Sequence, residues 1–157
     1  MKTAIYAGSF DPITNGHLDI LDRALKLFDR IIIAVGKNIE KNTLFTTEEQ
    51  IEMIKTATKG KNVEVNAFTG LLVDYAKKKK IRHIIRGLRA VSDFDYEFQM
   101  ATLNRRLSHE IDSVFLMTDK EYFYLSSSMV KQLAAAGGAI NDYVPKNVRI
   151  ELEKKFK

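Results

Sequence analysis

The sequence predicts an α/β fold with a doubly wound, five-stranded parallel sheet. Short apolar segments alternate along the chain with segments whose apolar residues recur at helical spacing. The run Arg30–Gly36 is β-branched and lacks polar alternation, which is typical of a parallel strand covered on both faces. The first apolar run leads through a glycine-containing turn into a helical pattern. These observations favour right-handed crossovers between parallel strands.

The amino-terminal third is expected to form strands over residues 3–7 and 30–36, separated by a helix. That helix has apolar residues at Leu18, Leu21, Leu25 and Phe28. Residues 36–45 are mostly polar and predict a loop at the carboxyl end of the second strand.

The next helix is predicted from a capping box, in which Thr46 caps the helix and Glu49 reaches back to it. The alternating run 63–68 then predicts an edge strand. It is followed by a helix that ends in the lysine run 77–80, where cations complement the helix dipole and are solvated. That run therefore needs no nucleic-acid partner.

A fourth strand over residues 83–85 and a fifth over 113–117 complete the predicted sheet. Between them, Ser92 or Asp93 is expected to cap a long helix. The apolar face of that helix consists of Phe94, Phe98, Met100, Ala101 and Leu107.

Two helices are expected to close the chain. The serine run 126–128 should cap a helix over 129–136, which the pair Gly137-Gly138 terminates. Pro145 suits the first turn of a last helix that ends near Phe156.

Composition limits the function without selecting one. The 157 residues suffice for one domain, expected to span 1–157, and 45% hydrophobic with 29% charged residues are typical of a soluble globular protein. The sequence has no cysteine, which excludes disulfides and thiol chemistry. The net charge of +5 suits nucleic acid, anionic membranes or phosphorylated small molecules. With no signal-type or membrane-length apolar run, a cytoplasmic location is expected.

The segment 7–20 has the features of a phosphate-binding turn. Gly8 permits close backbone approach to a ligand and Pro12 stiffens the turn. Asn15 is expected as the helix cap, which places His17 in the first turn, where free amides and the helix dipole favour an anion.

This segment resembles the signature of the nucleotidyltransferase superfamily related to class I aminoacyl-tRNA synthetases, whose HxGH element reads Thr14-Asn15-Gly16-His17 here. With the segments 85–90 and 125–131, the chain is similar to the bacterial phosphopantetheine adenylyltransferase family over about residues 5–145. The resemblance implies a Rossmann-like sheet in the order 3-2-1-4-5 with a C-terminal helix. It also implies AMP transfer from ATP to 4′-phosphopantetheine, giving dephospho-coenzyme A and pyrophosphate.

The resemblance assigns catalytic roles to His17, Lys41 and Arg89. His17 would donate a hydrogen bond to the α-phosphate, and Lys41 would hold the incoming phosphate against it. A histidine at a helix start is otherwise usually a cap or packing residue, and a loop lysine is usually solvated. Lys37 has no counterpart in the family pattern.

The resemblance also implies two sets of binding residues. Acceptor binding involves Ser9, Lys41, Leu72 and Arg86. ATP binding involves Ser9, Phe10, His17, Gly87, Leu88, Arg89, Glu97, Tyr122, Phe123, Tyr124, Leu125, Ser126, Ser127 and Ser128.

Structural alternatives remain open for several of these residues. Arg86 and Arg89 could instead pair with Asp93, Asp95 or Glu97. The serine run could serve only as a helix cap, and Leu72 as a core residue.

No metal-ligand pattern is present in the sequence, so Mg²⁺ is expected to arrive with ATP. The family resemblance further implies a homohexamer and coenzyme A as a feedback ligand. No nucleic-acid partner is expected, because the basic residues are scattered and no recognition module is visible, and no membrane partner is expected, because no apolar run is long enough to cross a bilayer. Within the superfamily, nicotinamide mononucleotide adenylyltransferases and cytidylyltransferases are the alternatives, although both typically have histidine at the position of Thr14. A non-catalytic nucleotide sensor or a nucleic-acid-binding domain is the alternative from another class.

Overall fold

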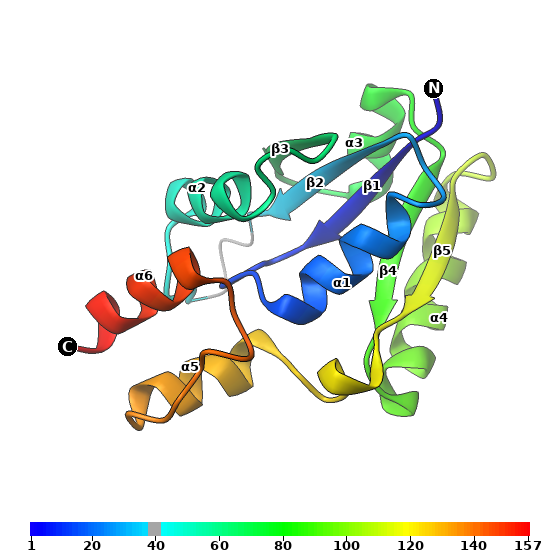
Figure 1. Cartoon of the computed structure of the whole chain (residues 1–157). Helices are drawn as coiled ribbons and strands as arrows, with labels where there is room; N and C mark the ends of the chain where they lie inside the picture. The colour runs from blue at the N-terminus through cyan, green and yellow to red at the C-terminus, as the bar shows by residue number, and fades with distance from the viewer. Residues whose placement is uncertain (38–41) are drawn as a thin grey trace.

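The central strand β1 (Thr3–Gly8) pairs with a parallel neighbour on each side (Figure 1). The computed structural model describes residues 1–37 and 42–157, and its five strands form one sheet in the order β3-β2-β1-β4-β5. The other strands are β2 (Arg30–Gly36), β3 (Val63–Phe68), β4 (His83–Leu88) and β5 (Asp112–Met117). The expected strand order and parallel pairing are confirmed. β4 extends beyond Ile85 and carries Arg86 within the strand.

Helices α1 to α4 connect successive strands, α5 and α6 follow β5, and the helices cover both faces of the sheet (Figure 1). Their bounds are α1 (Asn15–Ala24), α2 (Thr47–Ala57), α3 (Leu72–Lys79), α4 (Val91–Leu107), α5 (Ser127–Ala135) and α6 (Lys146–Phe156). A short 3₁₀ turn, Lys120–Tyr122, lies between β5 and α5. The C-terminal helix expected from the sequence is present.

Alternate residues of β2 pack into different layers of the core, which explains why the strand has no polar side. Ile31 and Ile33 face a cluster that includes residues of α1, α2, α5 and α6. Ile32 and Ala34 face a second cluster with residues of α3. Burying both faces of a strand stabilises the sheet and fixes its register. The edge strand β3 is only partly buried along its length.

The predicted start of α2 is confirmed, whereas the starts expected for α4 and α6 were wrong. Thr46 accepts a hydrogen bond from the Glu49 amide, and the Glu49 carboxylate accepts one from the Thr46 amide. At α4 the capping position is Ala90, because the Asp93 carboxylate reaches back to the amide of Ala90 from inside the first turn. Pro145 is likewise the cap of α6 and not part of its first turn.

The apolar face of α4 is exposed. Phe94 is 47% exposed, Phe98 56% and Leu107 53%. Only Glu97 is buried among the residues of this helix. The residues expected to form the apolar face of this helix are therefore mostly exposed, and within residues 1–37 and 42–157 little packs over them.

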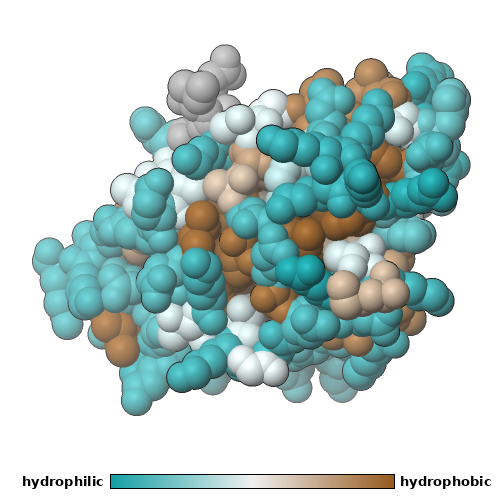
Figure 2. Space-filling model, turned by 90° about the horizontal axis from the view of Figure 1, so that it is seen from above, coloured by the Kyte–Doolittle hydropathy of each residue, from teal (hydrophilic) through white to brown (hydrophobic). Residues whose placement is uncertain are grey.

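The surface seen in Figure 2 is covered mainly by hydrophilic side chains, with hydrophobic atoms visible between them near its middle. Such a mixture is ordinary for a protein surface exposed to water. In the part of the chain that the structure describes, no helix combines the length and apolar character needed to cross a membrane.

Candidate active site

A cavity of about 450 Å³ opens at the carboxyl ends of β1 and β4. This is where the strand order reverses and where ligands bind in open α/β sheets. The cavity is lined by ten of the residues singled out from the sequence: Ser9, Phe10, His17, Arg86, Gly87, Arg89, Glu97, Ser126, Ser127 and Ser128. Chain segments far apart in the sequence thus converge on one site.

The turn after β1 holds His17 against an aromatic wall. Phe10 has a positive φ of 46° and is 2% exposed, and its ring lies edge-on to the His17 ring with centroids 5.0 Å apart. A Cβ at Gly8 would lie 3.2 Å from the Phe10 ring. Glycine therefore lets the backbone of the strand end pass close to this ring.

The cap of α1 is Thr14, so the expectation for Asn15 was wrong. Asn15 is instead the first helical residue, and its amide and side chain bond to carbonyls of the segment before α6. The Thr14 hydroxyl accepts a hydrogen bond from the His17 amide, while the Thr14 amide donates to His17 Nδ1 at 3.0 Å. This is a capping box in which histidine stands at the position usually occupied by glutamate.

The capping box fixes the tautomer of His17. Because Nδ1 accepts from a backbone amide, the proton of a neutral ring resides on Nε2. Burial, followed by the charges of Arg89 and Arg86, lowers the pKa of His17 to about 3. His17 is therefore a neutral hydrogen-bond donor near neutral pH.

Arg86 is paired with Glu97, one of the acidic partners considered from the sequence. Arg86 Nε lies 2.7 Å from Glu97 Oε2, and Nη2 lies 2.6 Å from Oε1. Nη1 also donates to the carbonyl of Ala7 at 2.7 Å. Burial would lower the pKa of Arg86, but the hydrogen bonds and charge of Glu97 outweigh it and raise that pKa.

Arg89 is anchored at one end of its guanidinium. Nη1 donates to the carbonyl of Leu125 at 2.9 Å, and Nε lies 3.5 Å from Asp93 Oδ2. Its side chain is 37% exposed, so it retains access to solvent. The described lining thus contains two arginines and two carboxylates, Asp93 and Glu97, whose formal charges cancel.

The serine run forms the amino end of α5, as expected. Ser126 caps the helix by accepting from the Met129 amide at 3.1 Å. Ser127 Oγ donates to the carbonyl of Pro12 at 2.7 Å, which docks α5 onto the turn after β1. The free amides of this first turn border the cavity and are suited to phosphate oxygens.

Of the other residues proposed from the sequence, those that the structure describes lie outside the cavity lining. Leu72 packs partly buried against the core cluster beneath α3, and Leu125 is 2% exposed. Phe123 and Tyr124 are exposed near the 3₁₀ turn, and Tyr122 packs partly buried against the core. Leu88 ends β4, and Lys41 lies outside the described residues.

Sequence reasoning missed several lining residues, notably Tyr6, Tyr96 and Thr118. Thr118 directly follows β5, so the rule that parallel strand ends share one edge could have found it. The sequence around Tyr96 and Tyr6 shows no comparable pattern that places them at the cavity.

Among the described residues, no group of three or more His, Cys, Asp or Glu side chains could hold a metal ion.

Residues 5–133 match the family model described as cytidylyltransferase-like. The chain is 55% identical over 157 residues to a phosphopantetheine adenylyltransferase of Desulfatibacillum aliphaticivorans, covering 99% of this chain and 90% of the relative. It is 54% identical to the protein of the same name in Clostridium botulinum strain 657, covering 99% and 96% of the two chains.

Solved structures support the same fold. A bifunctional NMN adenylyltransferase/ADP ribose pyrophosphatase from Francisella tularensis, complexed with AMP and a Mn ion, superposes with a TM-score of 0.72 at 17% identity. The match covers 98% of this chain and 48% of the bifunctional protein, so this chain spans about half its length. A second structure of that bifunctional protein gives a TM-score of 0.73.

Proposed function

The chain belongs to the phosphopantetheine adenylyltransferase family of cytidylyltransferase-like proteins, and from this we propose how its residues transfer AMP from ATP to 4′-phosphopantetheine. The products are dephospho-coenzyme A, a precursor of coenzyme A, and pyrophosphate. The observation that supports the assignment most strongly is the fixed, neutral His17 at the amino end of α1, within the cavity at the strand switch point.

The reaction is a direct in-line displacement. An oxygen of the 4′-phosphate forms a bond to the α-phosphorus of ATP, while the bond from that phosphorus to the α,β-bridging oxygen breaks. Pyrophosphate leaves with the electron pair. A phosphate is already nucleophilic at neutral pH, so the protein mainly has to position two anions and stabilise redistributed charge.

His17 donates its Nε2–H to a non-bridging oxygen of the α-phosphate. Its neutral state supports this role, because the ring keeps its donor without adding a charge that would need a counter-ion. The Thr14 amide donates to Nδ1, on the other side of the ring from Nε2, and fixes the ring orientation. Little reorganisation of His17 is therefore needed as the transition state forms. One preorganised donor of this kind contributes about 2.7–4 kcal/mol.

Arg89 and the amino end of α5, with Ser126 to Ser128, bind the triphosphate. Gly87 and Leu88 place backbone groups beside the nucleotide, and Ser9 and Phe10 border it from the turn after β1. Arg86 takes the acceptor phosphate and Leu72 the pantetheine arm. Lys41 acts on the acceptor phosphate. Residues 122–125 border the adenine.

Glu97 takes part in both substrate sites. It contacts the ribose or adenine side of ATP, and it also carries the ion pair with Arg86. A phosphate that enters beside Arg86 therefore shares the guanidinium with Glu97. Bidentate geometry suits both anions.

Mg²⁺ would enter with ATP, held mainly by phosphate oxygens and water, and would supply charge neutralisation at the leaving pyrophosphate. Coenzyme A contains the same pantetheine and adenylyl groups as the product, so it binds the same cavity as a feedback ligand.

We place the reaction in the cytoplasm, which localisation of a fluorescent fusion protein would test.

The protein assembles as a homohexamer, and the exposed apolar side chains of α4 support self-association. Phe94, Phe98, Leu103 and Leu107 are each 47–56% exposed on this helix. The rings of Phe94 and Phe98 lie side by side with centroids 5.7 Å apart, and exposed apolar patches commonly mark interaction surfaces. Phe98→Asp should lower the mass measured by sedimentation, whereas Leu27→Asp, at another residue that is 55% exposed, should leave it unchanged.

The test of function is pyrophosphate release from ATP and Mg²⁺ with 4′-phosphopantetheine, nicotinamide mononucleotide or glycerol 3-phosphate as acceptor, and a parallel series with CTP. We expect release only with ATP and 4′-phosphopantetheine. Release only with another pair would overturn the acceptor assignments but keep the His17 mechanism. No release with any pair would point to nucleotide sensing.

A further inference from the structure

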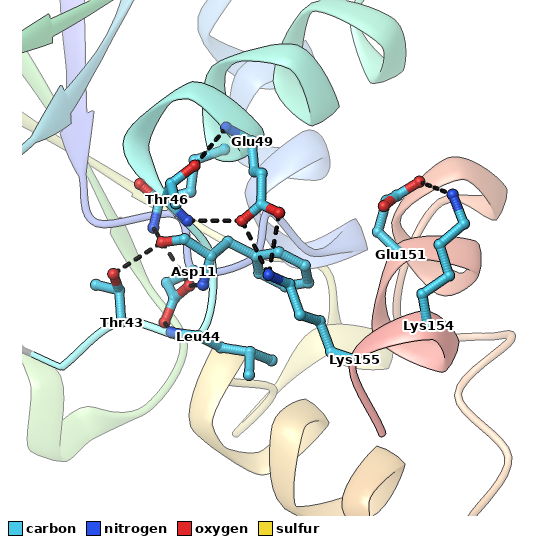
Figure 3. Close-up of polar contacts among 10 residues, drawn as sticks. Asp11, Thr43, Leu44, Thr46, Glu49, Glu151, Lys154 and Lys155 are labelled. Atoms are coloured by element: carbon cyan, nitrogen blue, oxygen red, sulfur yellow. Dashed lines mark hydrogen bonds and ion pairs between the residues drawn. The ribbon is translucent and has the colours of Figure 1, made fainter. Parts of the chain in front are cut away.

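Asp11 is a buried carboxylate that gathers donors from three separate segments. Its side chain is 6% exposed. Oδ2 accepts from the Leu44 amide at 2.9 Å and from Lys131 Nζ at 2.7 Å. Oδ1 accepts from the Phe45 amide at 3.0 Å and from Gln50 Nε2 at 3.2 Å. Figure 3 shows the Asp11 carboxylate beside the segment that contains Leu44.

The segments that meet at Asp11 frame the cavity. Asp11 belongs to the same turn as Ser9 and Phe10, which line the cavity. Lys131 lies one turn into α5, behind the serines at its amino end. Ser127 makes a second link, because its hydroxyl donates to the carbonyl of Pro12. Two polar contacts therefore fix α5 against the turn that precedes His17.

The charge state of Asp11 is suited to this link. Burial alone would raise the pKa of Asp11, but hydrogen bonds from Lys131, Leu44 and Phe45 outweigh it and lower that pKa. The carboxylate is thus ionised at neutral pH. Removing either member of a buried pair leaves the other charge uncompensated, so the two are expected to act as a unit.

Lys131 itself is not among the residues that line the cavity. Its side chain is 26% exposed and its ammonium is engaged by Asp11. We propose that Asp11 is a positioning residue for adenylyl transfer, which acts through Lys131 to set the amino end of α5 relative to His17. Through Leu44 and Phe45 it also fixes the segment that leads into α2. This inference rests on the proposed function of the serine run in binding the triphosphate.

The test is a double-mutant cycle with Asp11→Asn, Lys131→Met and the double variant. The measured quantities are kcat, the KM for ATP, the Kd for ATP by calorimetry and the midpoint of thermal unfolding. We expect each single variant to lower kcat/KM for ATP about ten- to a hundredfold, as misplacement of binding groups does. The double variant should be no worse than the more impaired single one. Lys131→Arg should restore most of the loss, because it preserves the cation.

The matched control is the ion pair between Glu151 and Lys154 on α6, which Figure 3 shows apart from Asp11. Glu151→Gln and Lys154→Met should leave kcat/KM unchanged.

Two outcomes would overturn the proposal. If Lys131→Met impairs ATP use while Asp11→Asn does not, Lys131 contacts the triphosphate itself. If only the unfolding midpoint falls and kcat/KM of the folded protein is retained, Asp11 is merely structural. Should the wild-type protein release no pyrophosphate, the proposed function fails, but the same cycle on the Kd for ATP still decides the role of Asp11.

Discussion

The guanidinium of Arg86 and the carboxylate of Glu97 meet through two parallel hydrogen bonds of 2.7 and 2.6 Å at the wall of the cavity. Glu97 is 7% exposed, and Arg86 also donates to the carbonyl of Ala7. All three nitrogens of the guanidinium are thus engaged. The pair joins β4 to α4 and holds the arginine in place at the cavity wall.

Replacing Glu97 with glutamine should destabilise the fold and strengthen anion binding. The variant leaves the Arg86 charge uncompensated in a largely buried position, which costs about 3 kcal/mol. It also removes one of the two carboxylates that cancel the arginine charges of the lining. We expect a lower urea midpoint with an unchanged m-value, and a lower Kd for 4′-phosphopantetheine by calorimetry.

Glu110→Gln is the control, because Glu110 and its partner Arg82 are 75% and 70% exposed. It should leave both measurements unchanged. Equal stability of the Glu97→Gln variant and the wild type would show that the buried pair contributes no net stabilisation.

Replacing His17 with alanine should reduce turnover much more than ATP binding. The Nε2–H donor acts mainly on charge in the transition state, so its removal should lower kcat about 10²- to 10³-fold. The Kd for ATP should change little, because the arginines and the amino end of α5 remain. Single-turnover kinetics and calorimetry measure the two effects separately.

His83→Ala provides the matched control, since His83 is an exposed histidine at the amino end of β4, away from the cavity. Its kcat should equal that of the wild type. Retention of full turnover by His17→Ala would remove His17 from the mechanism.

The depressed pKa of His17 also predicts a pH dependence of stability. Its pKa is about 3 in the folded protein against an ordinary value of 6.5, so within this window the unfolded chain binds a proton that the native state does not. Stability conferred by the neutral ring is therefore lost as pH falls below about 6.5. The loss approaches about 1.4 kcal/mol per pH unit.

Urea unfolding of wild type and His17→Gln at several pH values isolates this contribution, because glutamine does not titrate. We expect the wild type to lose stability more steeply than the variant between pH values of about 6 and 4. Parallel curves for the two proteins would mean that His17 titrates near its ordinary pKa.

The sheet was predictable from local patterns because each buried strand and each helix leaves its own hydrophobic period. The topology also brought Ser9, His17 and the serine run to one edge, as expected from the strand ends. The cap at Thr14 was missed because Thr14 and Asn15 are both common capping residues, and the sequence does not show which side chain accepts from the first turn; in the structure the Thr14 hydroxyl accepts from the His17 amide. The partner of Arg86 could be narrowed to nearby carboxylates, but choosing Glu97 needed the packing of α4 on β4.

Gly87 should not tolerate alanine, because a Cβ there would lie 2.9 Å from Cγ1 of Ile20. Ile20 is 1% exposed on α1, so it has little room to move, and overpacking costs about 1–3 kcal/mol. Since Ile20 lies one turn beyond His17, the displacement should also lower kcat. Thermal unfolding and steady-state kinetics measure both effects.

Gly16→Ala is the contrasting change for the stability effect. Its Cβ would meet its nearest neighbours at 3.5 Å, which is ordinary contact, and alanine favours a helix over glycine by about 1 kcal/mol. The unfolding midpoint of Gly16→Ala should therefore be unchanged or higher. The steric origin of the Gly87 effect is tested by repeating Gly87→Ala in an Ile20→Ala background, where its added cost should shrink. An undiminished cost in that background would place the strain in the β4 backbone instead of at Ile20.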